Sequence, residues 1–484
     1  MRRIDLRLAI VIVVLAGVTG CQVPEVYKNK PLIDIAHGGD ATLGTGGYRL
    51  PAMPSDISSP ELVLLLAFSG GGKRSSAFSY GALRGLRDIP FGPAEKQHRL
   101  LDEVDIIHSV SGGSFTSAYY GLYRDRIFTD FEKDFLRQDL NSYIWGLYLL
   151  PWHWTWMFHH SYGTNDHMQE LYDELMFHGA TYADLKKNGR PAILLGATDI
   201  SSGRVFTFNQ DTFDLICSDL SQLPIARAVA ASNGLPILFS PITLENHAEA
   251  CNGYRPEWLN RVSEGEDDAA VRRRLVAAAA EEYLDSSRTH YLHLSDGGIR
   301  DNLALRGLIS LILAFEDDPQ FQRAERLDLI RRFLVVSVDG EAAQDTSSAR
   351  EEVVSGWGRI ISAVSGSQID AYNFETMNVM RETIKQLVGR IKKIRCGLAP
   401  VIQGHPCDDV EGDFVHISLD GIKDETIRKR LQSIPTGLTI ADDDVDALVA
   451  AGEDQIKASQ VISRIVRDLN ESKSTSGRSD AITH

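Results

Sequence analysis

Ser111 stands at the end of an apolar run and at the start of a helical pattern. Residues 104–110 read VDIIHSV, and two glycines and the stretch SFTSAYYGLY follow the serine. A serine at such a turn holds its hydroxyl outward, and the positive end of the helix dipole favours a developing alkoxide. Ser109 occupies the place of the first glycine in the GxSxG pattern. The pattern predicts Ser111 as a nucleophile, although a Ser-Gly-Gly turn is also a common structural feature.

Three successive glycines, Gly70, Gly71 and Gly72, separate another apolar run from a helical pattern in the stretch SGGGKRSS (69–76). Without side chains, their N–H groups form an anion-binding start to the helix. The stretch lacks the spacing of a phosphate-binding Walker loop and of a dinucleotide fingerprint. It therefore favours an oxyanion hole for a tetrahedral intermediate. Arg74 would support the loop or meet a substrate phosphate, unless it is only a solvated arginine.

Asp296 follows a third apolar run, in LSDGGIRDN (294–302). Alone, this pattern is typical of an ordinary Asp-Gly turn. A Ser-His-Asp triad would also need a histidine placed after the acid. His416 lies in a predicted strand, His293 alternates with leucines in the strand before Asp296, and His108 is close in sequence to Ser111. These positions make the triad the weaker interpretation.

The elements around these residues alternate between two kinds of pattern. A continuous apolar run at 61–68 indicates a strand buried on both faces, and further strands are predicted at 104–109, 191–200, 289–296 and 331–340. Helical patterns lie between them, including 223–232 and 303–315. This alternation predicts an α/β layer fold with a mostly parallel sheet.

The three glycine-containing motifs, in this order, resemble the patatin-like phospholipase family over roughly residues 60–340. The match sets Gly70-Gly71-Gly72-Lys73-Arg74 on the family's oxyanion loop, Ser111 on its nucleophile, Asp296 on its catalytic aspartate, and Asn302 on a common asparagine. "AVAASNGLPILFSPI" (228–242) resembles another family segment. The sequence departs from the family pattern at Ser69, Ser75 and Ser109.

The resemblance implies a three-layer α/β fold with a central, mostly parallel sheet flanked by helices, to which this chain adds helical insertions. It also implies a Ser-Asp dyad that hydrolyses acyl esters of membrane phospholipid or lysophospholipid without a cofactor. A general carboxylesterase and a catalytically silent lipid-binding envelope protein are the alternatives.

The N-terminal residues resemble a bacterial lipoprotein signal. Arginines precede an apolar stretch from Leu8 to Val18, and Val18-Thr19-Gly20-Cys21 resembles a lipobox. This predicts lipidation of Cys21, and Gln22 favours the outer membrane over inner-membrane retention. We therefore expect a cell-envelope protein that reaches the membrane through its lipid anchor, facing the periplasm or the outside.

The expected organisation has five parts. They are a signal peptide at 1–20, a tether at 21–58, a catalytic domain at 59–345, a mainly helical C-terminal extension at 346–468 packed on that domain, and a disordered tail at 469–484. The formal charge of −16 argues against nucleic acid as a partner. The sequence leaves the oligomeric state open.

The four cysteines beyond Cys21 allow two local disulfides. Cys217 with Cys251 and Cys396 with Cys407 are the economical pairs in an oxidising compartment, and free buried thiols are the alternative.

Three stretches raise the question of membrane or metal binding. Residues 142–163 hold four of the six tryptophans and suit either a bilayer interface, an acyl-chain wall or packing on the body. Residues 381–396 form a basic amphipathic helix, for which packing is favoured over lipid binding. The aspartates in 441–454 are typical of helix capping, so no metal site is predicted.

Overall fold

The computed structural model describes residues 27–32, 41–42, 45–50, 53, 59–149, 162–236, 238–261, 268–315, 319–342 and 357–480. Its strands are β1 (Ala41–Thr42), β2 (Thr45–Gly46), β3 (Leu62–Phe68), β4 (Pro90–Phe91), β5 (His98–Arg99), β6 (Val104–Val110), β7 (Ala192–Asp199), β8 (Arg204–Phe208), β9 (Ile242–Glu245), β10 (Tyr291–Ser295), β11 (Arg332–Asp339), β12 (Val401–Ile402), β13 (His405–Pro406) and β14 (Glu411–Ser418).

The helices of the described residues are α2 (Gly72–Arg87), α3 (Gly112–Tyr123), α4 (Ile127–Phe131), α5 (Leu140–Leu149), α6 (Thr164–Tyr172), α7 (Tyr182–Lys187), α8 (Gln210–Leu215), α9 (Ile225–Ser232), α10 (Asp268–Tyr283), α11 (Gly298–Asp301), α12 (Leu305–Phe315), α13 (Pro319–Ala324), α14 (Trp357–Leu398), α15 (Glu425–Gln432), α16 (Asp442–Ala458) and α17 (Gln460–Asp480).

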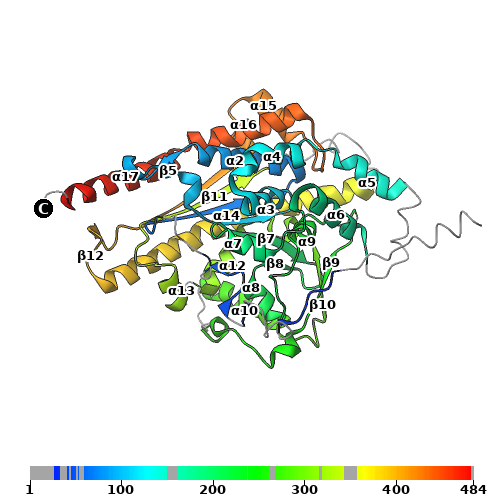
Figure 1. Cartoon of the computed structure of the whole chain (residues 1–484), viewed down its shortest axis with the longest axis horizontal. Helices are drawn as coiled ribbons and strands as arrows, with labels where there is room; N and C mark the ends of the chain where they lie inside the picture. Colours follow the sequence, from blue (N-terminus) through cyan, green and yellow to red (C-terminus); the bar gives the residue numbers. More distant parts are fainter. Residues whose placement is uncertain are drawn as a thin grey trace, which may run out of the picture.

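A mixed sheet of mostly parallel strands forms the centre of the molecule (Figure 1). Its order is β14-β11-β3-β6-β7-β10-β9, and β8 pairs with β7. The strands from β14 to β7 run parallel, whereas β8, β9 and β10 pair antiparallel. β6, β7 and β11 are buried along their whole length, which explains why most of their residues are apolar. The predicted α/β fold class is confirmed.

Helices cover both faces of this sheet, and consecutive residues of β6 show which helix lies on which face. The Ser109 hydroxyl lies 2.5 Å from that of Ser117 in α3. The next side chain back, His108, packs against Gly307 in α12. Because successive side chains of a strand point to opposite faces, α3 and α12 lie on opposite sides of the sheet. α2 packs beside α3, and α14 packs beside α12.

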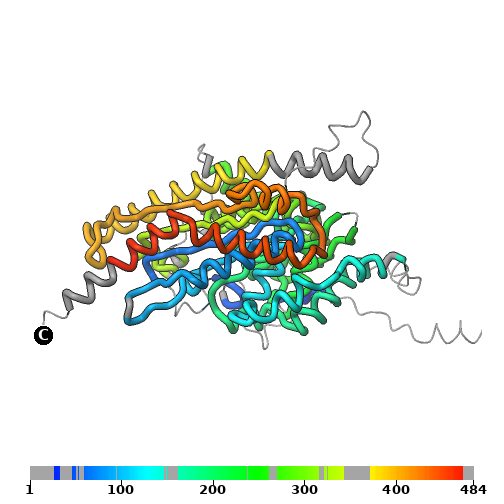
Figure 2. Tube along the Cα trace, turned by 90° about the horizontal axis from the view of Figure 1, so that it is seen from above, coloured from blue at the N-terminus to red at the C-terminus, as the bar shows by residue number. Residues whose placement is uncertain are grey.

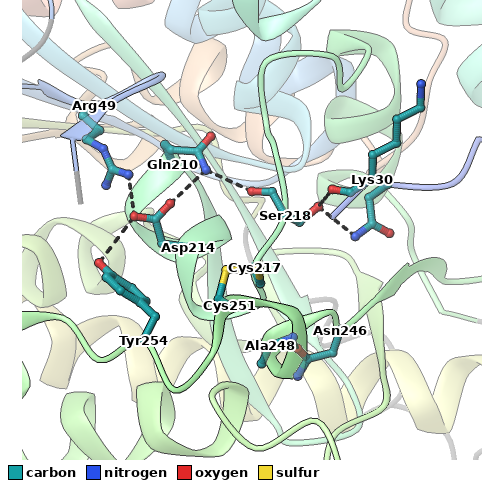
Figure 3. Close-up of a disulfide and its surroundings, with 11 residues drawn as sticks. Lys30, Arg49, Gln210, Asp214, Cys217, Ser218, Asn246, Ala248, Cys251 and Tyr254 are labelled. Atoms are coloured by element: carbon teal, nitrogen blue, oxygen red, sulfur yellow. Dashed lines mark hydrogen bonds and ion pairs between the residues drawn. A yellow bond between two sulfur atoms is a disulfide. The ribbon is translucent and has the colours of Figure 1, made fainter. Parts of the chain in front are cut away.

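Two stretches of the expected tether at 21–58 are bound to the body (Figure 3). The Asn29 amide donates to Ser218 Oγ at 2.9 Å. Arg49 is buried and forms an ion pair with Asp214. The prediction of a continuous free tether is therefore wrong here, because side-chain hydrogen bonds replace the periodic apolar contacts that a sequence pattern would reveal.

Both expected cysteine pairs form disulfides in the structure. Cys217 is bonded to Cys251 and Cys396 to Cys407, with Cα atoms 5.7 and 4.9 Å apart. The first bond lies beside the bound N-terminal stretch, since the Leu32 N–H donates to the Cys217 carbonyl at 2.8 Å (Figure 3). Cys21 lies outside the described residues.

The C-terminal extension is part of the core rather than an added layer. β14 pairs with β11 along its full length, and α16 lies along α2 (Figure 2). α17 continues to Asp480, so the disordered tail expected from residue 469 is wrong for the described residues. Leu469 is fully buried, because with Ile462 and Ile465 it continues one apolar face of the helix.

The described parts of the stretches considered for membrane or metal binding include segments of α5, α14 and α16. Ile384, Leu387 and Ile391 of α14 are buried, which supports the packing interpretation of 381–396. In α5, Trp145 is 63 % exposed, and the other three tryptophans of 142–163 lie outside the described residues. The three consecutive aspartates of 441–454, Asp442, Asp443 and Asp444, lie in the first turn of α16. Within the described ranges, no helix is long and apolar enough to cross a membrane.

Candidate active site

Ser111 lies at a strained turn between β6 and α3. Its backbone φ of 50° and ψ of −124° fall outside the regions that a residue with a Cβ favours. Such a conformation persists only where the surrounding structure enforces it. Gly112 follows with its Cα against the loop before α2, where an added Cβ would lie 2.0 Å from the Gly72 carbonyl oxygen. The glycine therefore allows the serine turn and the glycine loop to meet.

The Ser111 hydroxyl donates to Asp296. Its Oγ lies 2.8 Å from Oδ2, and the other carboxylate oxygen, Oδ1, accepts the Gly298 N–H at 2.7 Å. Ser111 and Asp296 are 6 % and 7 % exposed. Burial raises the pKa of Asp296 to about 6, and the hydrogen bonds from Ser111 and Gly298 oppose this rise. The pair is thus a buried hydroxyl held against a carboxylate that is a better base than an ordinary aspartate.

Gly196 of β7 brings these two residues together although they are far apart in sequence. Val110, directly before the serine, pairs with Gly196 in the sheet. Gly297, directly after the aspartate, packs on the same glycine, where an added Cβ would lie 2.5 Å from the Gly196 carbonyl oxygen. The end of β6 and the turn after β10 therefore meet across a single residue without a side chain.

The three loop glycines have different roles. The Gly70 N–H donates to the Asn302 carbonyl at 2.9 Å, so this donor is already used by the protein. The expectation that Gly70 donates to the oxyanion is therefore wrong, because this bond holds the loop against the turn that carries Asp296. Gly71 and Gly72 are the N-cap and first residue of α2, and their N–H groups are among the free donors of a helix start. Their φ angles of 131° and 60° require glycine.

The departures from the family pattern supply hydroxyl groups that hold this loop. The Ser69 hydroxyl accepts the Gly340 N–H at 2.9 Å. Ser75 donates to the Ser69 carbonyl at 2.6 Å. The third departure, Ser109, fits into the turn with its hydroxyl against α3. The structure therefore has room for a serine side chain at positions 69, 75 and 109.

Arg74 is a buried support for the loop rather than a residue that meets substrate. Its side chain is 1 % exposed, and Nε donates to the Gly340 carbonyl at 2.6 Å. The two terminal nitrogens donate to the Ile434 carbonyl and to Thr436 Oγ1. Burial lowers the pKa of Arg74 to about 10. Of its two expected roles, the contact with a lipid phosphate is wrong, because protein oxygens occupy the guanidinium group.

Asn233 and Tyr172 are site residues that the sequence did not single out. Asn233 Oδ1 lies 3.3 Å from Ser111 Oγ, and Nδ2 lies 3.2 Å from the Tyr172 hydroxyl. The neighbouring Ser232 accepts the Ser111 N–H at 3.0 Å through its hydroxyl. Asn233 lies in the stretch 228–242, whose resemblance to a family segment was the one signal in the sequence that could have pointed to it. That resemblance does not distinguish a site residue from a helix-capping residue.

The three histidines of the alternative triad bond elsewhere. The His108 ring contacts the Ala304 carbonyl at 2.7 Å and is fully buried. His293 contacts Thr243, and His416 contacts Ser337. No described histidine forms a hydrogen bond with Ser111 or Asp296.

Comparison with known proteins adds a family and a set of similar folds. Residues 66–309 match the family model described as patatin-like phospholipase. Human GIVD cytosolic phospholipase A2 is 11 % identical with a TM-score of 0.36, and its complex with methyl gamma-linolenyl fluorophosphonate is 11 % identical with a TM-score of 0.32. The alignments cover 85 % and 86 % of this chain, but only 60 % of the human chain. No curated protein matches the sequence.

Proposed function

Because the chain belongs to the patatin-like phospholipase family, we propose that it is a serine acyl-ester hydrolase acting on membrane phospholipid or lysophospholipid. The observation that carries this proposal is the 2.8 Å hydrogen bond from Ser111 Oγ, at a strained strand-to-helix turn, to the buried Asp296 carboxylate. No other described residue offers the serine a stronger base.

In the proposed mechanism, Asp296 accepts the hydroxyl proton while Ser111 Oγ attacks the ester carbonyl carbon. The tetrahedral oxyanion then accepts hydrogen bonds from the N–H groups of Gly71 and Gly72. The aspartic acid returns the proton to the leaving alcohol, and an acyl-serine ester remains. Water attacks that ester with Asp296 as base, which releases the fatty acid and restores the serine.

The environment of Asp296 suits this role without a histidine. A base works best when its pKa is close to the working pH, and burial moves the pKa of Asp296 from its ordinary range to about 6. At neutral pH most of the enzyme would therefore hold the ionised carboxylate that the first step requires.

We also propose that Cys21 carries a lipid anchor in the outer membrane, as the lipobox resemblance suggests. The two disulfides support a place outside the cytosol, since such bonds persist in oxidising compartments. An anchored enzyme would meet its phospholipid substrate in the membrane to which it is attached.

A test of the function uses the full chain in detergent. Wild type, Ser111→Ala and Asp296→Asn would be assayed on a chromogenic acyl ester and on phospholipid, with circular dichroism to verify folding. Labelling by a fluorophosphonate probe reports the nucleophile independently of substrate choice. We expect wild type to react in all three assays and Ser111→Ala in none.

The alternatives give different outcomes. A carboxylesterase would cleave the chromogenic ester but not phospholipid. A silent lipid-binding protein would cleave neither and would not react with the fluorophosphonate. Retention of activity by folded Ser111→Ala would exclude the dyad.

A further inference from the structure

Two arginines near the candidate active site contact the same aromatic ring. The guanidinium carbons of Arg300 in α11 and Arg306 in α12 lie 5.7 and 4.8 Å from the ring centroid of Tyr372 in α14. The two cations are therefore no farther apart than the sum of these distances. Arg300 is exposed, and Tyr372 is 47 % exposed.

Neither arginine forms an ion pair with a described carboxylate, although Arg306 Nε donates to Thr376 Oγ1 at 3.0 Å. The nearby Asp301 attracts Arg306, but its two oxygens accept the N–H groups of Leu305 and Gly307 at the start of α12. Burial and repulsion from Arg300 and Arg272 lower the pKa of Arg306. In a chain with 66 acidic and 50 basic residues, adjacent arginines without a bonded carboxylate leave a local positive charge open to an anion.

α11 is fixed to the catalytic residues at both ends. Gly298, its first residue, donates to Asp296 Oδ1 at 2.7 Å. Asn302, directly after α11, accepts the Gly70 N–H at 2.9 Å. Arg300 lies between these two residues in the chain, so its backbone is within about one helical turn of both contacts, and its side chain extends from there to the ring of Tyr372.

Exposed apolar side chains also occur on the two helices that carry Arg300 and Tyr372. Ile299 of α11 is 42 % exposed, and Phe374 of α14 is 61 % exposed.

We propose that Arg300 and Arg306, with Tyr372 between them, bind the phosphate group of a phospholipid next to the dyad. Guanidinium groups present forked donors that match phosphate oxygens. Free phosphate offers the same anionic oxygens to the two arginines as a phospholipid does. The choice of a phospholipid as the ligand therefore rests on the proposed function.

The test measures equilibrium binding to full-length Ser111→Ala, so that hydrolysis does not consume the ligand. The probes are dihexanoyl phosphatidylglycerol below its micelle concentration, the uncharged dihexanoylglycerol, and inorganic phosphate as competitor. Arg300→Gln is the main variant, since its side chain has no hydrogen bond to the described protein. Arg126→Gln is the matched control, because Arg126 is exposed and pairs with Asp130 elsewhere.

We expect Arg300→Gln to weaken binding of the phospholipid about ten-fold or more, as loss of a charge-assisted contact should, and to leave dihexanoylglycerol unaffected. Arg306→Lys should weaken phospholipid binding less than Arg300→Gln does, and Arg126→Gln should leave phospholipid binding unchanged. Competition by inorganic phosphate would support a site that also accepts the free anion. Absence of competition, with the Arg300 effect intact, would support recognition of the lipid head group.

Equal phospholipid binding by folded Arg300→Gln and by its parent would overturn the inference. Failure of this inference can be distinguished from failure of the proposed function. A loss of binding in a protein that hydrolyses no ester would keep the phosphate site and reject the hydrolase. If wild type hydrolyses the ester but the Arg300→Gln change leaves phospholipid binding unaltered, the hydrolase is kept and the phosphate site is rejected.

Discussion

Asp296 is suited to accept a proton because it is buried, and the same burial costs folding energy. Its pKa of about 6 lies above the value of about 3.9 expected for an unfolded chain. The folded protein therefore binds the proton more tightly than the unfolded chain does. The stabilisation linked to this carboxyl is complete below the unfolded pKa and is lost as the pH rises through about 6.

Two pH dependences follow for this residue. The kcat/KM of wild type should fall below pH about 6 as one proton binds. Folded Asp296→Asn should be inactive, yet more stable than wild type at pH 8 by on the order of 2–3 kcal/mol, from about two pKa units. The stability difference should disappear near pH 4. Urea unfolding at both pH values measures it, and a constant difference would show that Asp296 does not titrate in this range.

Asn233 is the second residue whose chemistry can be tested. Ser111 has one hydroxyl proton for two acceptors, Asp296 at 2.8 Å and Asn233 Oδ1 at 3.3 Å. A half-turn of the Asn233 amide would instead point Nδ2 at Ser111 and Oδ1 at the Tyr172 hydroxyl. In that orientation the Asn233 Nδ2 donates to Ser111 Oγ and the Tyr172 hydroxyl donates to Asn233 Oδ1. The Ser111 hydroxyl proton is then free to be donated to Asp296.

We therefore expect Asn233→Ala to lower kcat by about 10–100-fold with a small change in KM, since the lost amide lies 3.3 Å from the attacking oxygen. Tyr172→Phe should have a smaller effect in the same direction and should slow fluorophosphonate labelling. Tyr182→Phe is the control, because that buried hydroxyl has no hydrogen-bond partner. An unchanged kcat in Asn233→Ala would assign the amide to structure alone.

At the scale of elements, the C-terminal extension positions the glycine loop at residues 70–72, the proposed oxyanion hole. The Lys73 N–H donates to the Gly437 carbonyl at 2.9 Å, and Arg74 reaches Ile434 and Thr436 in the same turn. α16, which follows this turn, packs on α2 through glycines, since a Cβ on Gly81 would lie 2.1 Å from the Val449 carbonyl oxygen. The glycine loop thus depends on residues more than 350 positions away.

Gly81→Ala should destabilise the protein by about 1–3 kcal/mol, because the added methyl group pushes α16 away from α2. Activity of the remaining folded protein should fall as well, since the turn that holds Arg74 moves with α16. Gly389→Ala in α14 is the matched control, where an added Cβ meets nothing within 4 Å. It should be neutral or stabilise the helix by about 0.5–1 kcal/mol. Thermal melts measure the Tm of both variants. Equal Tm values for Gly81→Ala and Gly389→Ala would contradict the close packing of α16 on α2.

At the scale of the whole molecule, the bound N-terminal stretch limits how far the body can lie from a lipid on Cys21. Tyr27, where the described stretch begins, is six positions after Cys21, with five residues between them. A chain of that length spans at most about 20 Å. The proposed anchor would therefore hold the face around Ser218 and Glu245, where Asn29 binds, close to the membrane.

Lipidation can be followed directly. Cys21→Ser should abolish incorporation of labelled palmitate and move the protein from the membrane to the soluble fraction, with hydrolysis of the chromogenic ester retained. Gln22→Asp is the control that should keep the label and shift the protein towards the inner membrane. Label that persists in Cys21→Ser would exclude this anchor.

The sequence by itself determined the α/β class, the main strands and the candidate dyad. Strands buried on both faces must be continuously apolar, and the turns that carry Ser111 and Asp296 need local glycines, so both leave short-range patterns. Only the tertiary structure decided that Asn233 reaches Ser111, that the Gly70 N–H is already bonded, and that residues before 59 bind the body. Each of these depends on a hydrogen bond between residues more than 100 positions apart, and such contacts produce no periodicity in the chain.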